Sequence, residues 1–144
     1  MKFDHFGVIV SDLNKGRKHF THIYSIKNWT NEFYDEKNGV VVQFGRDTSG
    51  ACFELVAPID DNSPVYNVMS KKINILNHIA YLVDNISICV EDLLKNNFML
   101  LGEPNMAIAY NMRRIQYLYS KDFSYLLELI EAPDHEHIYS AKNV

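Results

Sequence analysis

Two histidines and two glutamates occupy matching places in the two halves of this chain. His5 and Glu54 are 49 residues apart in the sequence, and His78 and Glu128 are 50 apart. Each of the four lies in or at the start of an apolar run that is typical of a β-strand. A carboxylate inside such a run either faces water or has a buried partner that offsets its desolvation. Each of the four alone has an ordinary structural explanation, so their repetition is the informative feature.

The sequence around these residues repeats as well. Residues 4–13 (DHFGVIVSDL) match residues 77–86 (NHIAYLVDNI) in a polar residue, a histidine, an apolar run ending in valine and an acidic cap. Residues 53–58 (FELVAP) match residues 127–133 (LELIEAP) in an apolar residue, a glutamate, two aliphatic residues and a closing Ala-Pro. An internal repeat of this kind indicates two related structural modules.

Two modules related by a pseudo-twofold axis would bring the two imidazoles and the two carboxylates together. Such a donor set suits a divalent first-row metal, for example Ni, Co, Zn, Mn or Fe. It also leaves coordination positions open for water and for an oxygen-containing substrate. The pattern therefore favours a metal centre over four unrelated side chains.

Hydrophobic patterning predicts the elements that position these residues. Strands are expected at residues 3–10, 40–44, 51–57, 79–83, 98–101, 114–119 and 125–130. One helix should begin after a cap at Ser11 or Asp12 and run to about residue 26, and another should begin after Asp84 or Asn85 and end at Asn96. The apolar face of the first helix should consist of Leu13, Phe20, Ile23 and Tyr24.

These elements predict an α+β fold in a single domain, residues 1–144. A first βαβββ module is expected over residues 2–60 and a second over residues 75–133. The linker, residues 61–74, should contain a short helix that starts at Ser63-Pro64. Residues 134–144 form a polar tail, which we expect to be flexible.

Composition narrows the possible partners and the cellular location. The chain has 14 basic and 18 acidic residues and no basic stripe, so nucleic acid is not an expected partner. No apolar run is long enough to cross a membrane, and the first residues lack the apolar core of a signal peptide. We therefore expect a cytoplasmic protein in which Cys52 and Cys89 are reduced.

The order of histidine strand, helix and glutamate strand, present twice, resembles the vicinal oxygen chelate superfamily over residues 2–133. Four parts of the sequence are similar to methylmalonyl-CoA epimerases and bacterial lactoylglutathione lyase-like proteins. They are HFGVIV and DL within residues 5–13, ELVAP and DNSPV within 54–65, NHIA and VDNI within 77–86, and RIQYL and LEL within 114–129. The resemblance implies two paired βαβββ modules that form an incomplete barrel around a divalent metal (Ni, Co, Zn or Mn). It also implies that the ligands are His5, Glu54, His78 and Glu128.

The resemblance further implies an enzyme that removes a proton next to a carbonyl group of a small molecule. An epimerase acting on an acyl thioester is the first expectation, and isomerisation of a hemithioacetal by a lactoylglutathione lyase-like enzyme is the alternative. A metal-free small-molecule or drug-binding protein of the same fold is a third possibility, but such proteins typically lose the ligand residues that this chain keeps. Two departures stand out: no carboxylate lies near Val42-Gln43, where some epimerases carry one, and the first strand has no arginine for glutathione.

We expect three residues to have roles in catalysis and substrate binding. Glu54 and Glu128 are the expected catalytic residues, and Glu128 is the favoured proton carrier because its strand is the more apolar and a raised pKa would suit that task. Arg114 is expected to bind a substrate carboxylate or phosphate, although an exposed charge at the start of a strand is equally consistent with the sequence. A homodimer is expected because open half-barrels expose sheet edges.

Overall fold

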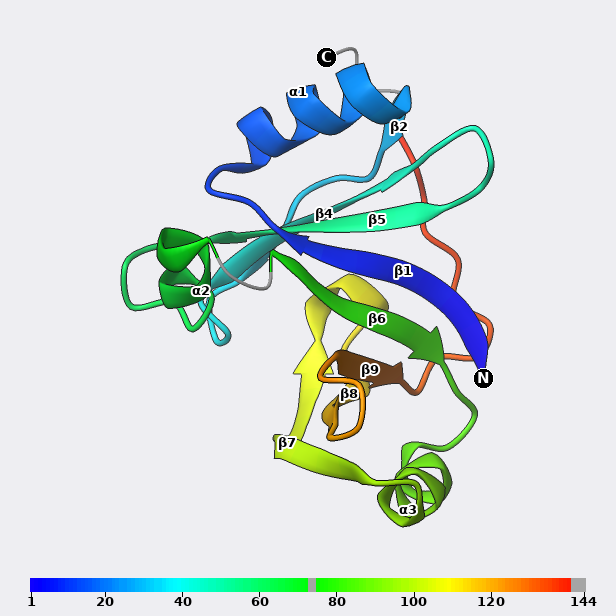
Figure 1. Ribbon diagram of the computed structural model, residues 1–144. Helices are drawn as coiled ribbons and strands as arrows, with labels where there is room; N and C mark the ends of the chain where they lie inside the picture. Colours follow the sequence, from blue (N-terminus) through cyan, green and yellow to red (C-terminus); the bar gives the residue numbers. More distant parts are fainter. Residues whose placement is uncertain (73–74, 141–144) are drawn as a thin grey trace. The chain divides into compact units, whose positions relative to one another are not determined.

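The computed structural model describes residues 1–72 and 75–140 (Figure 1). Residues 73–74 of the predicted linker and 141–144 of the predicted tail lie outside the described part. The predicted α+β class is confirmed. The helices are α1 (Leu13–Tyr24), α2 (Tyr66–Lys71), α3 (Ile86–Lys95) and a short 3-10 helix, η1 (Ile108–Tyr110). The strands are β1 (Lys2–Ile9), β2 (Asn28–Trp29), β3 (Phe33–Asp35), β4 (Val40–Arg46), β5 (Cys52–Pro58), β6 (Leu76–Leu82), β7 (Phe98–Ala107), β8 (Arg113–Ser120) and β9 (Leu126–Ile130).

The chain folds as two compact units, and strand β1 contributes to both. The N-terminal unit consists of residues 6–77 together with the chain from residue 137 onward. The C-terminal unit consists of residues 1–5 and 78–136. The described strands follow an open order in which β2 pairs only with β4 and β7 only with β8, so they do not close into a ring.

In the N-terminal unit the strand order is β2-β4-β5-β1, with β3 also paired to β4. Helix α1 packs on one face of these strands, and its buried residues are Leu13, Gly16 and Phe20. Asp12 caps the helix by accepting a hydrogen bond from the Lys15 backbone N–H at 2.9 Å, as the sequence predicts. Tyr24 is 46% exposed although its ring stacks on Phe53, and Ile23 is 54% exposed, so the predicted place of Ile23 on the buried face is wrong. It lies in the last turn, at the margin of the buried stripe.

Close packing in this unit depends on Gly45. Gly45 pairs with Trp29, which is fully buried. A Cβ atom at Gly45 would lie 2.6 Å from the Trp29 ring, far inside the contact distance. The absence of a side chain at this position therefore allows the Trp29 ring to lie directly against strand β4.

The short helix α2 begins later than the sequence predicts. Val65, not Ser63, is its N-cap, and no side chain caps it. The preceding residues form turns instead, since the Asp60 carboxylate accepts from the Asn62 N–H at 2.8 Å and the Asp60 carbonyl accepts from the Ser63 N–H at 3.1 Å. These turns delay the start of the helix to Tyr66.

In the C-terminal unit the first residues of β1 lie beside β6, and the order continues β6-β9-β8-β7. Strands β6 and β9 are parallel and bring Ala80 opposite Glu128. Helix α3 begins after Asn85, whose side chain accepts from the Ile88 N–H at 3.1 Å. One face of the sheet packs on α3 through a core of buried residues, namely Val83, Ile86, Leu118, Leu127 and Leu129.

The described part of the tail is packed rather than flexible. The Ser140 N–H donates to the Trp29 carbonyl at 2.9 Å, which adds residue 140 to the edge of β2. The His137 ring stacks on Phe44 with centroids 4.1 Å apart, and the Tyr139 hydroxyl lies 3.1 Å from the Cys52 sulfur. The expectation of a flexible tail is therefore wrong for these residues. No helix within the described ranges has the length and apolar character that crossing a membrane requires.

Candidate metal centre

Three of the four predicted ligands come together in the C-terminal unit, each from a different strand. His5 lies on β1, His78 on β6 and Glu128 on β9. Side chains alternate between the two faces of a strand, so Leu127 and Leu129 face the α3 core while Glu128 points to the other side. Glu128 thus interrupts an apolar run because its side chain faces the opposite side of the strand from Leu127 and Leu129.

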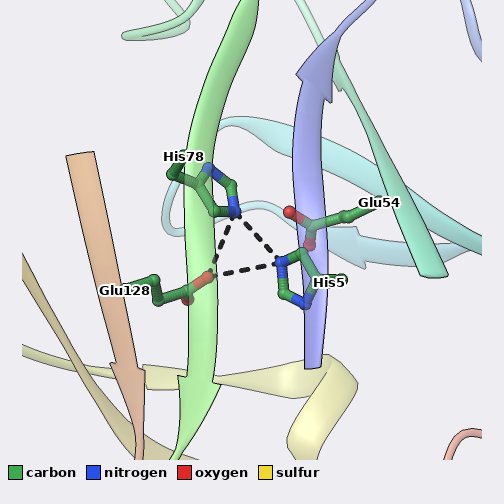
Figure 2. Close-up of side chains that lie close together, drawn as sticks. All are labelled: His5, Glu54, His78 and Glu128. Carbon is green, nitrogen blue, oxygen red and sulfur yellow. Dashed lines mark hydrogen bonds and ion pairs between the residues drawn. The ribbon is translucent and has the colours of Figure 1, made fainter. Parts of the chain in front are cut away.

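The donor atoms of these three side chains converge (Figure 2). The two histidine Nε2 atoms lie 3.0 Å apart. Glu128 Oε2 lies 3.2 Å from His78 Nε2 and 3.5 Å from His5 Nε2. His5 is completely buried and Glu128 is 3% exposed, so the cluster is shielded from water.

The cluster fits a divalent metal ion. Glu128 Oε2 is buried and accepts no hydrogen bond of acceptable geometry, which leaves a polar atom without its usual compensation. Ligand atoms about 2.1 Å from an ion are separated from each other by about 3.0 Å in octahedral and about 3.4 Å in tetrahedral geometry. The three separations in the cluster cover that range. Two imidazoles and a carboxylate are also the donors that first-row metals prefer.

The electrostatics of Glu128 differ from the sequence-based expectation. Burial by itself raises the pKa of the Glu128 carboxyl, but the two neighbouring imidazoles, His5 and His78, lower it by more. The net direction of the pKa is downward, whereas a raised pKa was expected for a proton carrier. Glu128 is therefore held in its ionised form, the form that a metal ligand requires.

Glu54, the fourth predicted ligand, lies on β5 in the N-terminal unit and is 8% exposed (labelled in Figure 2). It pairs with Gly7 of β1 on one side and with Phe44 of β4 on the other. Residues two apart on a strand share a face, so Gly7 lies on the same face of β1 as His5. Glu54 pairs with Gly7 and therefore lies on the corresponding face of β5. Strand β1 thus carries one predicted ligand and pairs directly with another.

Arg114 lies on β8 and is engaged in a surface ion pair. Its side chain is 43% exposed, and Nη1 lies 3.5 Å from the Glu131 carboxylate. Strand alternation places Arg114 on the opposite face of β8 from Tyr117, whose ring centroid is 5.6 Å from that of His78. Arg113 shares the face of Tyr117. Binding of substrate by Arg114 remains a prediction.

Gln43, near the place where some epimerases carry a carboxylate, has structural partners. It is buried, and its side-chain oxygen accepts from Arg17 at 2.9 Å while its amide donates to the Thr30 carbonyl at 2.8 Å. Gln43 pairs with Leu55, so it lies on the face opposite that of Glu54. It ties α1 to β4 and is not oriented with the predicted ligands.

Sequence reasoning missed two residues next to the cluster, Asp4 and Tyr110. The Asp4 carboxylate oxygen Oδ2 lies 2.8 Å from His5 Nδ1. The Tyr110 hydroxyl donates to the same oxygen at 2.5 Å. An aspartate directly before a candidate ligand was a signal that could have been used, whereas nothing in the sequence pointed to Tyr110.

The sequence profile of the glyoxalase/bleomycin resistance protein/dioxygenase superfamily matches residues 4–117. The chain belongs to this superfamily. The match includes His5, Glu54 and His78, and it ends before Glu128. No curated protein is similar enough in sequence to be counted as a relative.

Solved structures of the superfamily share the fold. The methylmalonyl-CoA epimerase of Streptomyces coelicolor, solved as a single-residue variant in complex with 2-nitronate-propionyl-CoA, has a TM-score of 0.76 and 23% identity over 96% of this chain and 99% of its own. The methylmalonyl-CoA epimerase of Mycobacterium tuberculosis has a TM-score of 0.74 and 21% identity over 90% of this chain and 86% of its own. A hypothetical protein of Bacillus halodurans has a TM-score of 0.79 and 20% identity over 95% of this chain and 98% of its own. At these identities the likeness shows the fold alone.

Proposed function

We propose that the protein is a metal-dependent enzyme that transfers a proton at the carbon next to a carbonyl, as an epimerase of an acyl-CoA thioester. The observation that carries the proposal is the buried convergence of His5, His78 and Glu128, with a carboxylate oxygen that no hydrogen bond satisfies. The shared fold with methylmalonyl-CoA epimerases supports the choice of reaction and substrate class.

The residues proposed to hold the ion, one of Ni, Co, Zn or Mn, are His5, His78, Glu128 and Glu54. Glu54 is included because it pairs with Gly7 on the face of β1 that carries His5. When bound, a divalent ion polarises a carbonyl oxygen and stabilises the negative charge that develops on it. The four side chains leave coordination positions open for substrate oxygens in an ion that accepts six ligands.

The two carboxylates are proposed to move the proton. Glu128 is ionised at neutral pH because its pKa is lowered, so it can accept a proton but cannot donate one before the reaction begins. Glu54 belongs to the other unit and is proposed as the second proton carrier, since epimerisation removes a proton on one face of a carbon and returns it on the other. The half-buried ring of Tyr117 next to His78 limits the access of water on the C-terminal side.

Deuterium exchange tests this proposal directly. The metal-loaded protein in deuterated water should incorporate deuterium at the carbon next to the carbonyl of a 2-substituted malonyl-CoA thioester. Glu128→Gln should reduce the exchange rate by at least about 100-fold, the lower range for a lost proton carrier. Glu91→Gln is the matched control, because Glu91 is an exposed residue of helix α3 and is not part of the cluster. Full exchange by Glu128→Gln would contradict the proposal.

A lactoylglutathione lyase-like reaction is the second candidate, because the matched superfamily includes glyoxalases. Strand β1 has no arginine, so the glutathione carboxylate would need another partner, and Arg113 or the predicted Arg114 are the candidates on β8. Turnover of a hemithioacetal without exchange of acyl thioesters would favour this reaction. Ligand binding that chelators do not affect would instead favour a small-molecule-binding protein that needs no metal.

The cytoplasmic location of the protein also remains a proposal.

A further inference from the structure

We propose that Asp4 and Tyr110 are positioning residues that keep the His5 proton on Nδ1, so that Nε2 carries a lone pair with which it can bind metal. The inference rests on the proposed metal site and concerns two residues to which no role has been assigned. It explains how one histidine of the cluster is prepared for coordination before any ion arrives.

Asp4 and Tyr110 both contact the Nδ1 side of the His5 ring in the C-terminal unit. His5 is completely buried, and its Nδ1 lies 2.8 Å from Asp4 Oδ2, whose side chain is only 8% exposed. The Tyr110 hydroxyl donates to the same Asp4 oxygen at 2.5 Å and lies 3.1 Å from His5 Nδ1. The Asp4 carboxylate is thus the common acceptor of two groups.

Hydrogen-bonding chemistry then fixes the tautomer. An ionised carboxylate has no proton to donate, so a hydrogen bond between Asp4 and His5 requires the proton to be on Nδ1. A neutral imidazole carries one proton, and Nε2 therefore keeps its lone pair. That lone pair is directed toward His78 Nε2, at 3.0 Å, and Glu128 Oε2, at 3.5 Å, where the ion would bind.

Tyr110 holds Asp4 in place for this task. Neighbouring residues on a strand point to opposite faces, so the Asp4 carboxylate must turn back to reach the ring of the next residue. The Tyr110 hydroxyl secures that orientation, and Tyr110 itself is buried at the end of η1. Its ring stacks near His5, with centroids 6.4 Å apart, and packs on His135 at 4.5 Å. The support is therefore built from three separate segments of the unit.

The two repeats differ at the residue that precedes each histidine. Asn77 occupies the position in the second repeat that Asp4 occupies in the first. An amide carries no negative charge and cannot strengthen a neighbouring imidazole as a metal ligand in the way that a carboxylate does. The first repeat therefore places a carboxylate directly before its histidine, and the second places an amide there.

Nitrogen NMR of the metal-free protein tests the tautomer without reference to activity. In the wild type, the His5 ring should show a protonated Nδ1 and an unprotonated Nε2. Asp4→Ala should shift His5 toward the tautomer with the proton on Nε2, and Asp4→Asn, which retains an acceptor oxygen, should restore the Nδ1 proton. Asp92→Ala and Tyr34→Phe change exposed residues of the same types and should leave the His5 signals unchanged.

Metal affinity, measured by competition with a chelator, supplies the second readout. Asp4→Ala should weaken binding about 10- to 100-fold, the range found for such supporting partners, and Asp4→Asn and Tyr110→Phe should weaken it less. An unchanged His5 tautomer in Asp4→Ala, or equal metal affinity of Asp4→Ala and wild type, would overturn the inference. Tyr110→Phe preserves the ring packing, so it tests the support even if Asp4→Ala does not fold. Metal binding and tautomer control without any thioester exchange would contradict the proposed reaction and leave this inference standing.

Discussion

At the residue scale, the ionisation of Glu128 makes a prediction about acid stability. The folded-state pKa of Glu128 is lower than its unfolded value, so its contribution to stability is fully present above about pH 4.3 and is lost as the pH falls through the folded-state value. The free energy of unfolding of the metal-free wild type should therefore fall more steeply below about pH 4 than that of Glu128→Gln. Denaturant titrations at a series of pH values, with chelator present, measure this difference. Parallel pH curves for the two proteins would contradict it.

The residues of the candidate metal site were predictable because they are repeated. His5, His78 and Glu128 stand in matching contexts in both halves of the sequence, and the structure brings their donor atoms together. The pKa direction of Glu128 was not predictable, because it depends on the exact approach of two imidazoles from other strands. The Asp4–Tyr110 contact joins residues far apart in the chain, and no local pattern signals such a contact.

At the scale of elements, the contact between Gly45 and Trp29 predicts a sharp cost of substitution. Gly45→Ala should lower the free energy of unfolding by about 1–3 kcal/mol, because the new methyl group would overlap a fully buried ring. Gly102→Ala is the matched control, since its added methyl group meets open space and only its positive φ is unfavourable. Denaturant unfolding of both variants measures the difference. Equal or smaller destabilisation by Gly45→Ala would show that β2 can shift away at little cost.

The packed tail predicts that truncation destabilises the N-terminal unit. Removal of residues 137–144 eliminates the His137–Phe44 stack and the Ser140–Trp29 hydrogen bond. Each interaction of these kinds contributes about 0.5–1.5 kcal/mol, so the midpoint of thermal unfolding should fall by several degrees. A chain that ends at Ser140 retains both contacts and serves as the control. An unchanged midpoint in the longer truncation would show that the packing contributes nothing to stability.

The sequence predicted those helices and strands that local residue patterns, such as a capping residue, mark. The caps of α1 and α3, Asp12 and Asn85, were predicted because a cap is defined by its own residue and the next turn. Strands β2 and β3 have too few residues to show alternation, and they exist because β4 offers an edge for pairing. Strand β7 continues past residue 101 to Ala107 although residues 102–105 (GEPN) read as a turn. Its register shifts between Leu101 and Asn105, as an irregular edge strand allows.

At the scale of the whole molecule, we expect two copies of the chain to associate. Among the described strands, β7 pairs only with β8, and four apolar residues on it are exposed, namely Met99, Leu100, Leu101 and Met106. A long edge strand with apolar side chains is prone to pair with another chain, and a second copy would cover it. Light scattering during size exclusion should show a dimer, and Leu100→Lys should shift it toward monomer. Ile23→Lys, on the exposed side of α1, is the control. A wild-type monomer at micromolar concentration would contradict the expectation.

The most direct test of the proposed metal centre is the metal content of the untagged protein by mass spectrometry, with Glu128→Ala prepared alongside. We predict about one divalent ion per chain in the wild type and its loss in the variant, because the buried carboxylate and the two imidazoles bind the ion together. Absence of bound metal in the wild type, even after dialysis against Ni, Co, Zn and Mn, would contradict the proposed metal centre and the enzyme built on it.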